Sequence, residues 1–329
     1  MIVNVILSGG VGSRLWPLSN KKRPKQYLNL FSNKSLFELT VLRNSSVTQS
    51  VLLVGNEKSV KLGEQILEDI KIEYNTIIES IPRNTSAAIA FAALESNPED
   101  ILVVTPADHL IEEQLLYEKC INEAIELAKD NFIVTFGITP LKPETGFGYI
   151  EYTENDVTSF REKPSLEQAD LFFKSGKFLW NSGIFCFKAS VFLDELKKLD
   201  SEIYSSSLIA KRNSISNKIN HNLSEKIPAV SIDYSVMEKS KIIKVVKSDF
   251  TWNDMGSFES LYEYYLSIGH KVDEHGNMII GNANPTFFIG LKNVIAIFDD
   301  GANLILSKNS SQEVKSLYND LECSNSNLI

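Results

Sequence analysis

Short apolar runs alternate with stretches of helical periodicity along the first half of the chain. The runs are rich in β-branched residues and predict strands at 2–7, 51–54, 75–79, 101–105 and 132–137. Between them, apolar residues recur with a helical period at 35–44, 57–69, 85–95 and 113–129. Strands that are apolar throughout are typical of a sheet covered on both faces. The alternation of strand and helix therefore predicts an α/β fold with a doubly wound, mainly parallel sheet.

The second half of the chain has a more mixed pattern. It predicts strands at 149–154, 157–163, 182–189 and 241–249, and helices at 166–175, 189–198, 204–212 and 257–266. Near residue 268 the pattern changes to short apolar runs separated by Gly and Asn, followed by a charged helix at 310–321. We therefore expect a large α/β domain of residues 1–267 and a small β-rich domain of residues 268–329. The segments MIIGNA and FFIGLK are similar to hexapeptide solenoid repeats, although a stable solenoid needs about three of them.

Charge and cysteine content exclude several classes of protein. The net charge of −9 and the isoelectric point of about 5.2 argue against nucleic acid or an anionic membrane as a general partner. The three cysteines are far apart and form no CxxC, which favours a reducing, cytoplasmic location. No apolar stretch approaches the ~20 residues of a membrane span. The first apolar run is also too short for a signal peptide.

The most unusual stretch, VILSGGVGSRLWPLSNKKRPKQ, contains the end of the first predicted strand. In doubly wound sheets, ligands bind beyond the carboxyl ends of the strands. Gly9, Gly10 and Gly12 allow backbone N–H groups to approach an anion closely. Arg14 and Lys25 add two cations suited to phosphate oxygens. The loop thus favours a nucleoside triphosphate, although a glycine turn with solvated charges explains the loop alone equally well.

Two standard phosphate-binding motifs do not match this loop. A P-loop requires a Lys directly after its last glycine, and this chain has none at that spacing. A dinucleotide fingerprint requires a third glycine where Leu15 stands, and an acidic residue where the chain reads KKRPKQ. A nicotinamide cofactor is therefore disfavoured.

Two aspartates are candidate metal ligands. Asp108 follows the strand predicted at 101–105, and Asp254 precedes the helix predicted from Ser257. Two carboxylates with phosphate oxygens and waters are a typical arrangement for Mg²⁺. Taken alone, each aspartate is better explained as a turn or helix-capping residue.

A set of ordered motifs resembles one enzyme family. LSGGVGSRLWPLS, RPKQYL, PRNTSAAIAFAAL, VTPADHLI, GFGYIE, REKP, LWNSGIFCF, SIDYSVMEKS and WNDMGSFESLYEY occur in this order over about residues 1–265. Together they resemble the sugar nucleotidyltransferases, and most closely the mannose-1-phosphate guanylyltransferases. The resemblance implies that residues 1–267 form a catalytic domain that transfers GMP from GTP to α-D-mannose 1-phosphate, giving GDP-mannose and pyrophosphate.

The resemblance also implies roles for individual residues. Arg14 would hold the departing phosphates, Lys25 would neutralise the α-phosphate, and Asp108 and Asp254 would bind Mg²⁺. The implied nucleotide-binding residues are Leu7, Gly9, Gly10, Gly12, Ser13, Arg14, Lys25, Arg83, Asn84, Ser86 and Asp108, of which Arg83, Asn84 and Ser86 would contact guanine.

The acceptor side is implied by three further motifs. Gly146, Glu162 and Asn181 would contact the sugar, and Lys163 would bind its phosphate and act in catalysis. A β-turn, a solvated charge run and a turn asparagine explain these motifs equally well without the resemblance. The chain departs from the family at Arg161, where relatives commonly carry an apolar or acidic residue.

Three alternatives stay open at this point. The same chemistry could use another hexose or heptose 1-phosphate, or another nucleoside triphosphate, because single residues shift such contacts. A catalytically inactive, nucleotide-sensing subunit is disfavoured because Arg14, Lys25, Asp108, Lys163 and Asp254 are all present. We expect no isomerase activity, since a barrel of roughly 100 residues does not fit in residues 268–329. This C-terminal region is expected to pack on the catalytic domain or to form a homodimer contact.

Overall fold

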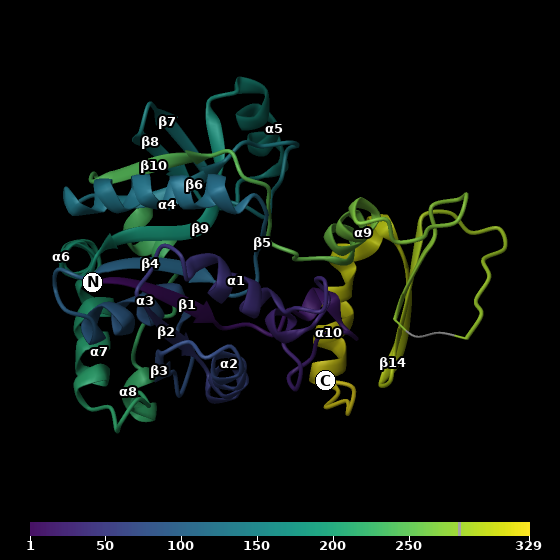
Figure 1. The fold of residues 1–329 in the computed structure, drawn as a ribbon, viewed down its shortest axis with the longest axis horizontal. Helices are drawn as coiled ribbons and strands as arrows, with labels where there is room; N and C mark the ends of the chain where they lie inside the picture. The colour runs from purple at the N-terminus through teal and green to yellow at the C-terminus, as the bar shows by residue number, and fades with distance from the viewer. Residues whose placement is uncertain (282–283) are drawn as a thin grey trace. The chain divides into compact units, whose positions relative to one another are not determined.

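The computed structural model describes residues 1–281 and 284–329, which form two compact units (Figure 1). The first unit comprises residues 1–9, 40–107 and 111–252, and the second comprises residues 10–39, 108–110 and 253–329. This division differs from the one predicted at 267/268, because the glycine loop and the segment after it pack with the C-terminal strands rather than with the large sheet.

One mixed sheet dominates the first unit. Among the described residues, nine strands follow the order β3-β2-β1-β4-β9-β6-β10-β8-β7. Their bounds are β1 Ile2–Ser8, β2 Ser50–Gly55, β3 Tyr74–Ile78, β4 Ile101–Pro106, β6 Ile133–Ile138, β7 Tyr149–Thr153, β8 Asp156–Arg161, β9 Phe178–Lys188 and β10 Ile243–Ser248. Strands β1 to β4 pair in parallel, so their carboxyl ends share one edge. The α/β class is thus confirmed.

The longest strand of the sheet, β9, pairs with its neighbours in an antiparallel arrangement. β9 runs antiparallel to both β4 and β6, and β7 and β8 form an antiparallel pair. The sheet is therefore mixed rather than mainly parallel. The parallel pairing β6–β10 nevertheless brings together two strands that are far apart in the sequence.

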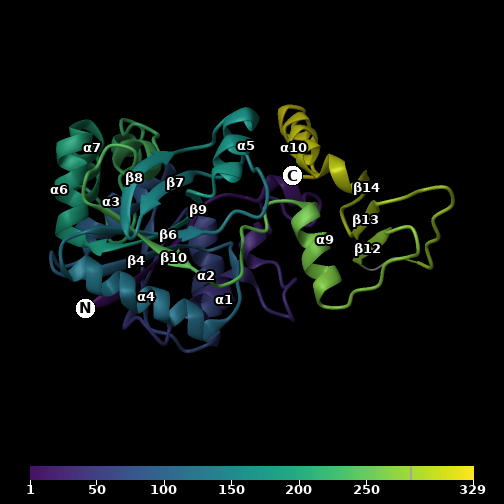
Figure 2. The same cartoon turned by 90° about the horizontal axis from the view of Figure 1, so that it is seen from above.

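The strand pattern explains why helices cover both faces of the sheet. In β4, Leu102 and Val104 belong to one hydrophobic cluster, while Ile101 and Val103 belong to another. Successive side chains of a strand point to opposite faces, so this strand buries both. The helices of this unit and its borders are α1 Leu36–Asn44, α2 Glu57–Asp69, α3 Asn84–Glu95, α4 Gln114–Lys129, α5 Leu166–Ser175, α6 Ala189–Leu199, α7 Ser201–Arg212 and α8 His221–Ser224. Figure 2 shows α4 on one side of the sheet and α6 and α7 on the other.

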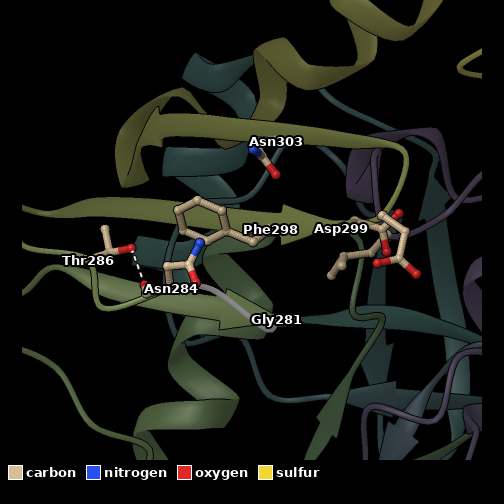
Figure 3. A pocket seen from close by; sticks show the side chains of 8 residues that line it. Gly281, Asn284, Thr286, Phe298, Asp299 and Asn303 are labelled. Carbon is tan, nitrogen blue, oxygen red and sulfur yellow. Dashed lines mark hydrogen bonds between the residues drawn. The ribbon is translucent and has the colours of Figure 1, made fainter.

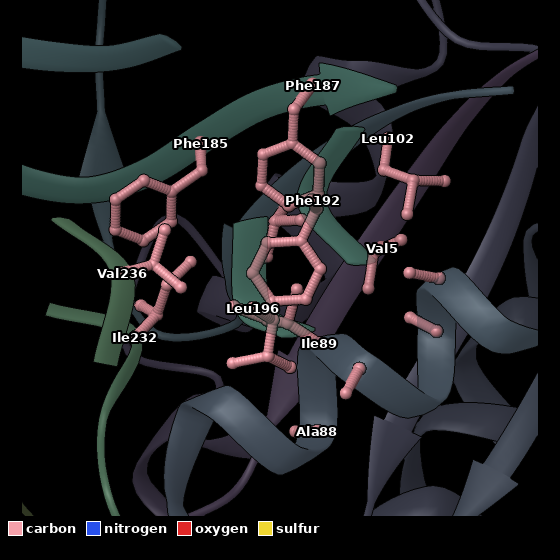
Figure 4. Packing of buried hydrophobic residues seen from close by; sticks show 14 of the residues in the cluster. Val5, Ala88, Ile89, Leu102, Phe185, Phe187, Phe192, Leu196, Ile232 and Val236 are labelled. Carbon is pink, nitrogen blue, oxygen red and sulfur yellow. The ribbon is translucent and has the colours of Figure 1, made fainter. Parts of the chain in front are cut away.

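Helix α3 is buried on nearly every side. Its residues from Ser86 to Ala93 are all buried, which is possible because most of them are small. Figure 4 shows Ala88 and Ile89 of this helix beside larger side chains from β9 and α6. Among these, Phe187 and Phe192 stack with their ring centroids 4.9 Å apart. The alanine-rich sequence thus lets the helix pack close to its neighbours.

The second unit has its own hydrophobic core. Leu15 and Trp16 from the segment after the glycine loop share a cluster with Met278, Ile280 and Ile295. The Trp16 indole N–H donates to the carbonyl of Leu328, 2.9 Å away. The elements of this unit are η1 Ser13–Leu15, η2 Lys25–Tyr27, α9 Phe258–Ser267, β12 Met278–Gly281, β13 Val294–Asp299, β14 Ala302–Ser307, η4 Lys308–Glu313 and α10 Val314–Cys323. Two short strands, β5 Leu110–Ile111 and β11 Trp252–Asn253, pair with each other.

The C-terminal strands form a small sheet in the order β12-β13-β14. β12 and β13 are parallel, while β13 and β14 are antiparallel. Of the predicted repeat MIIGNA, the first four residues form β12, and Asn282 and Ala283 lie outside the described residues. FFIGLK contains no strand. No helix in the described residues is long and apolar enough to cross a membrane.

Candidate functional site

The glycine loop leaves β1 and turns sharply at two glycines. Gly10 and Gly12 have φ angles of 29° and 78°, in the left-handed region that favours glycine. A Cβ atom on Gly12 would lie only 2.3 Å from the Cβ of Lys25. The backbone N–H of Lys25 donates to the carbonyl of Val11 at 3.0 Å. Glycine at position 12 therefore allows Lys25 to pack against the loop.

Lys25 connects the two predicted metal ligands. It is only 5% exposed, and its Nζ lies 2.7 Å from Asp108 Oδ2. The same ammonium donates to the backbone carbonyl of Asp254 at 2.7 Å. The Asp254 carboxylate accepts the N–H of Gly256 at 3.1 Å. Three residues predicted for one site from distant parts of the sequence thus lie together in the second unit.

The environment of Asp108 favours its charged form. Burial alone would raise the pKa of this carboxyl group, but the charges of Lys25 and His109 and the hydrogen bond from Lys25 outweigh that effect. The pKa of Asp108 therefore lies below its ordinary value. Its side chain is still 38% exposed, so a second cation can approach. Carboxylate oxygens, which Asp108 and Asp254 supply, are the donor type that Mg²⁺ prefers, and the residues present fit that ion.

Arg14 lies in the short helix η1, directly after the glycine loop. It is half-buried, and among the described residues it has no ion-pair partner. Its neighbour in sequence, Leu15, is buried in the core of the second unit. The guanidinium is thus carried by an anchored segment while it stays available for an anion.

The predicted guanine-binding residues lie at the start of α3 in the first unit. Asn84 has a φ angle of 70°, and its side chain accepts the N–H of Thr85 at 2.9 Å. Arg83 donates from Nε to the carbonyl of Ile227 at 2.6 Å. Ser86 is fully buried and shares a hydrogen bond with Ser235. Their contact with a base stays a prediction, and Ser86 is engaged inside the protein.

Glu79 is a residue that the sequence analysis missed. It follows β3 at the carboxyl edge of the sheet, is 6% exposed, and its Oε1 has no hydrogen-bond partner among the described residues. Burial raises the pKa of this carboxyl group to about 7, although the backbone N–H of Arg83 donates to it. It lines a cavity of about 440 Å³ with Ser80 and His221. The signal for Glu79 in the sequence is a glutamate at the end of the apolar run predicted as a strand at 75–79.

The predicted acceptor residues Glu162 and Lys163 follow β8. Glu162 Oε1 lies 2.7 Å from Lys163 Nζ, and Lys163 adopts a φ angle of 44°. Burial lowers the pKa of Lys163, but the hydrogen bond and charge of Glu162 outweigh this, so the net shift is upward. Both residues line a cavity of about 530 Å³ with Glu238.

Two glycines and Asn181 complete this group. The Gly146 N–H donates to Glu144 Oε1 at 3.0 Å, so this amide is engaged without a ligand. A Cβ atom on Gly148 would lie 2.5 Å from Glu162 Oε2, so the carboxylate packs directly on this glycine. Asn181 donates its backbone N–H to the carbonyl of Gly148 at 2.8 Å. Gly148 is thus the glycine that this arrangement requires.

The remaining predicted residues fall on the loop itself. Leu7 is the penultimate residue of β1, and its carbonyl accepts the N–H of Ala107 at 3.1 Å. Ser13 begins η1. An added Cβ on Gly9 would meet no described atom within 4 Å, so its backbone faces open space.

A separate pocket of about 490 Å³ lies in the second unit (Figure 3). It is lined by Leu18, Gly281, Asn284, Thr286, Phe298, Asp299, Asp300 and Asn303. Asp299 is engaged by Arg23, whose Nη2 lies 2.6 Å from its Oδ2. None of the catalytic, substrate-binding or metal-binding residues predicted from the sequence lines this pocket.

Comparison with known proteins identifies the family. Residues 3–270 match the nucleotidyl transferase family. The chain is 34% identical to a mannose-1-phosphate guanylyltransferase of Escherichia coli, over 96% of this chain and 73% of that protein. It is 36% identical to the alginate biosynthesis protein AlgA of Pseudomonas aeruginosa, over 98% of this chain and 72% of that protein.

Two solved structures are also similar. One, described as a mannose-1-phosphate geranyltransferase from Thermus thermophilus, has a TM-score of 0.83 and 25% identity, with 98% of this chain and 99% of that chain covered. Another, described as a mannose-6-phosphate isomerase from Helicobacter pylori, has a TM-score of 0.70 and 39% identity, with 77% and 99% covered. The resemblance predicted from the sequence is thus confirmed, and the chain belongs to the nucleotidyl transferase family.

Proposed function

We propose that this enzyme transfers GMP from GTP to mannose 1-phosphate, giving GDP-mannose and pyrophosphate. The observation that carries the proposal is the meeting of buried Lys25 with Asp108 and Asp254 beside the glycine loop. The curated relatives named as mannose-1-phosphate guanylyltransferases support the choice of substrates.

The reaction asks little covalent work of the protein. An oxygen of the sugar phosphate attacks the α-phosphorus of GTP, the bond to the bridging oxygen breaks, and pyrophosphate leaves in line. Catalysis then consists of positioning and of stabilising the charge that develops at phosphorus. Mg²⁺ held by Asp108 and Asp254 would supply additional positive charge at the phosphates.

Lys25 and Arg14 divide the phosphates between them. Lys25 is buried and held by two oxygens, so its ammonium is fixed in place before substrate binds. A fixed cation costs little reorganisation when charge builds on the α-phosphate. Arg14 has no ion-pair partner in the described residues and carries a planar fork suited to the departing phosphates.

Glu79 supports guanine as the base of the nucleotide substrate. The pairing edge of guanine presents N–H donors, including its exocyclic amino group, and an ionised carboxylate is a pure acceptor. Glu79 is buried beside the segment 83–86 and has one oxygen without a partner in the described residues. We propose that this oxygen accepts from the base, together with contacts from Arg83 and Asn84.

On the acceptor side, Lys163 would bind the phosphate of the sugar and Glu162 its hydroxyls. The two side chains are already paired, and Gly148 leaves the space that the Glu162 carboxylate occupies. We propose a cytoplasmic location, which the free cysteines Cys120, Cys186 and Cys323 support. A homodimer stays a prediction.

A pyrophosphate-release assay tests the proposal. The purified chain is mixed with GTP, Mg²⁺ and mannose 1-phosphate, and we expect release that requires all three. A panel of other sugar 1-phosphates and of ATP, CTP and UTP runs in parallel. A clear preference for another acceptor or base would reject the proposed substrates, and the absence of any release would reject the activity.

A further inference from the structure

The two ends of a short π-helix contact two of the proposed acceptor residues, Asn181 within β9 and Glu162 directly after β8. Helix η3 (Asp233–Met237) is defined by the bond from the Glu238 N–H to the Asp233 carbonyl, five residues back, at 2.9 Å. π-helical turns are rare and occur frequently at functional sites. Here the turn places one carboxylate at each end of the helix, Asp233 and Glu238.

The first carboxylate fixes the side chain of Asn181. Asn181 Nδ2 donates to Asp233 Oδ1 at 3.0 Å. Its Oδ1 accepts from Thr135 Oγ1 at 3.1 Å and from the N–H of Gly183 at 3.1 Å. Three hydrogen bonds therefore set the orientation of this amide and leave one Nδ2 hydrogen for a ligand.

The second carboxylate holds the backbone at Glu162. Glu238 Oε1 accepts the N–H of Glu162 at 3.2 Å. The next residue, Lys163, adopts the left-handed conformation that a residue with a side chain seldom takes. Such strain persists where the surroundings hold it, and the bond from Glu162 to Glu238 is one such restraint.

Asp233 also lies in the field of the charged acceptor residues. Burial raises the pKa of its carboxyl group to about 6, and the negative charge of Glu162 adds to this effect, while Lys163 opposes it. A half-buried carboxylate beside another carboxylate lowers the stability of the fold, so its presence here points to a function. Orienting Asn181 is the task that its hydrogen bond identifies.

We propose that Asp233 is a positioning residue for the sugar phosphate, which holds Asn181 in the orientation that receives the acceptor. The inference rests on the proposed acceptor side, and nothing in it depends on which sugar the enzyme uses. Asp233 acts through Asn181, so the loss of either residue should have the same consequence for acceptor binding and little for GTP.

Kinetic variants test this role. We expect Asp233→Ala to raise KM for the acceptor by about tenfold or more, because this variant loses one hydrogen bond to a charged group. KM for GTP should stay within about twofold of the wild-type value. Asp233→Asn keeps an oxygen that can accept from Asn181, and we expect it to restore most of the affinity. The double variant Asn181→Ala with Asp233→Ala should have a KM for the acceptor no higher than that of the single variant with the higher KM. The control Asp156→Asn changes an exposed carboxylate on β8 and should change neither KM.

Binding measurements separate this inference from the proposed function. Calorimetric titration of mannose 1-phosphate and of inorganic phosphate gives acceptor affinity without turnover, and thermal unfolding shows whether each variant folds. If the wild type prefers another sugar 1-phosphate, mannose 1-phosphate is rejected as the substrate. The role of Asp233 is then tested with the same variants and the preferred sugar phosphate. An unchanged acceptor affinity in Asp233→Ala, additive effects of the two alanine changes, an equal rise in KM for GTP, or a wild type that binds no sugar phosphate would each overturn the role of Asp233.

Discussion

At the scale of single residues, the pairing of Lys25 with Asp108 has two consequences. It keeps a buried ammonium neutralised, and it keeps Asp108 ionised where a metal ion is expected. If Lys25 binds the α-phosphate as we propose, it would exchange a carboxylate oxygen for a phosphate oxygen on substrate binding. The same ammonium would then contribute to stability in the free enzyme and to binding in the complex.

Replacing Asp108 by Asn should separate these roles. We expect Asp108→Asn to lower kcat by about 10²–10³-fold, as is typical when a preorganised charge is removed, and to raise the Mg²⁺ concentration required for half-maximal rate. Rates measured over a Mg²⁺ titration check this. Lys34→Gln, which removes a partly buried ion pair with Glu38, should leave both quantities unchanged. Near-normal turnover of Asp108→Asn would rule out the metal assignment.

Glu79 gives the protein a distinct dependence of stability on pH. Its pKa is about 7 in the folded protein, above the ordinary value of 4.5, so the folded state binds this proton more tightly. The resulting stabilisation is complete below about pH 4.5 and is lost as the pH rises through about 7. Between pH 6 and pH 8.5, the wild type should lose about 1.4 kcal/mol of unfolding free energy relative to Glu79→Gln.

Urea unfolding of both proteins at the two pH values measures this difference. Glu57→Gln is a suitable control, because Glu57 lines the same cavity but is exposed and paired with Lys218. If wild type and Glu79→Gln respond to pH in parallel, the carboxyl group titrates near its ordinary value and its burial does not raise the pKa.

At the scale of elements, periodicity alone predicted most of the first unit. The expected helices at 57–69 and 166–175 coincide with α2 and α5, because each has an N-cap residue and an amphipathic pattern, and α5 also has a C-terminal glycine. The strand predicted at 182–189 was too short, since β9 begins at Phe178. Its polar residues Asn181 and Ser182 interrupt the apolar run, and only tertiary hydrogen bonds show that the strand continues through them.

The candidate site was predictable to a similar degree. Arg14 and Lys25 were proposed from their charge and their place after the first strand, whereas Asp108 and Asp254 were assigned to a metal only through the resemblance to a known family. The structure brings Lys25, Asp108 and Asp254 together. Glu79 and Asp233 were missed because burial and unusual helix geometry, which give them their character, are not visible in a one-dimensional pattern. Residues that stand in a recognisable motif were thus easier to predict than residues whose character comes from their surroundings in the fold.

At the scale of the whole molecule, the C-terminal strands share a core with the segment that follows the glycine loop. Ile295 in β13 is fully buried in the cluster that contains Leu15 and Trp16. A change at Ile295 should therefore act on residues almost three hundred positions away. If the glycine loop binds the nucleotide as we propose, the C-terminal region would support nucleotide binding as well as its own fold.

The pair Ile295→Ala and Ile305→Ala tests this connection. Both change isoleucine in the same small sheet, but Ile295 is fully buried while Ile305 is 62% exposed. We expect Ile295→Ala to cost about 2–5 kcal/mol of stability and Ile305→Ala about 0.5 kcal/mol or less. Because Arg14 and Lys25 are carried by the affected core, Ile295→Ala should also raise KM for GTP while leaving KM for the sugar phosphate unchanged. A variant that is destabilised but binds GTP normally would show that the C-terminal core and the glycine loop behave independently.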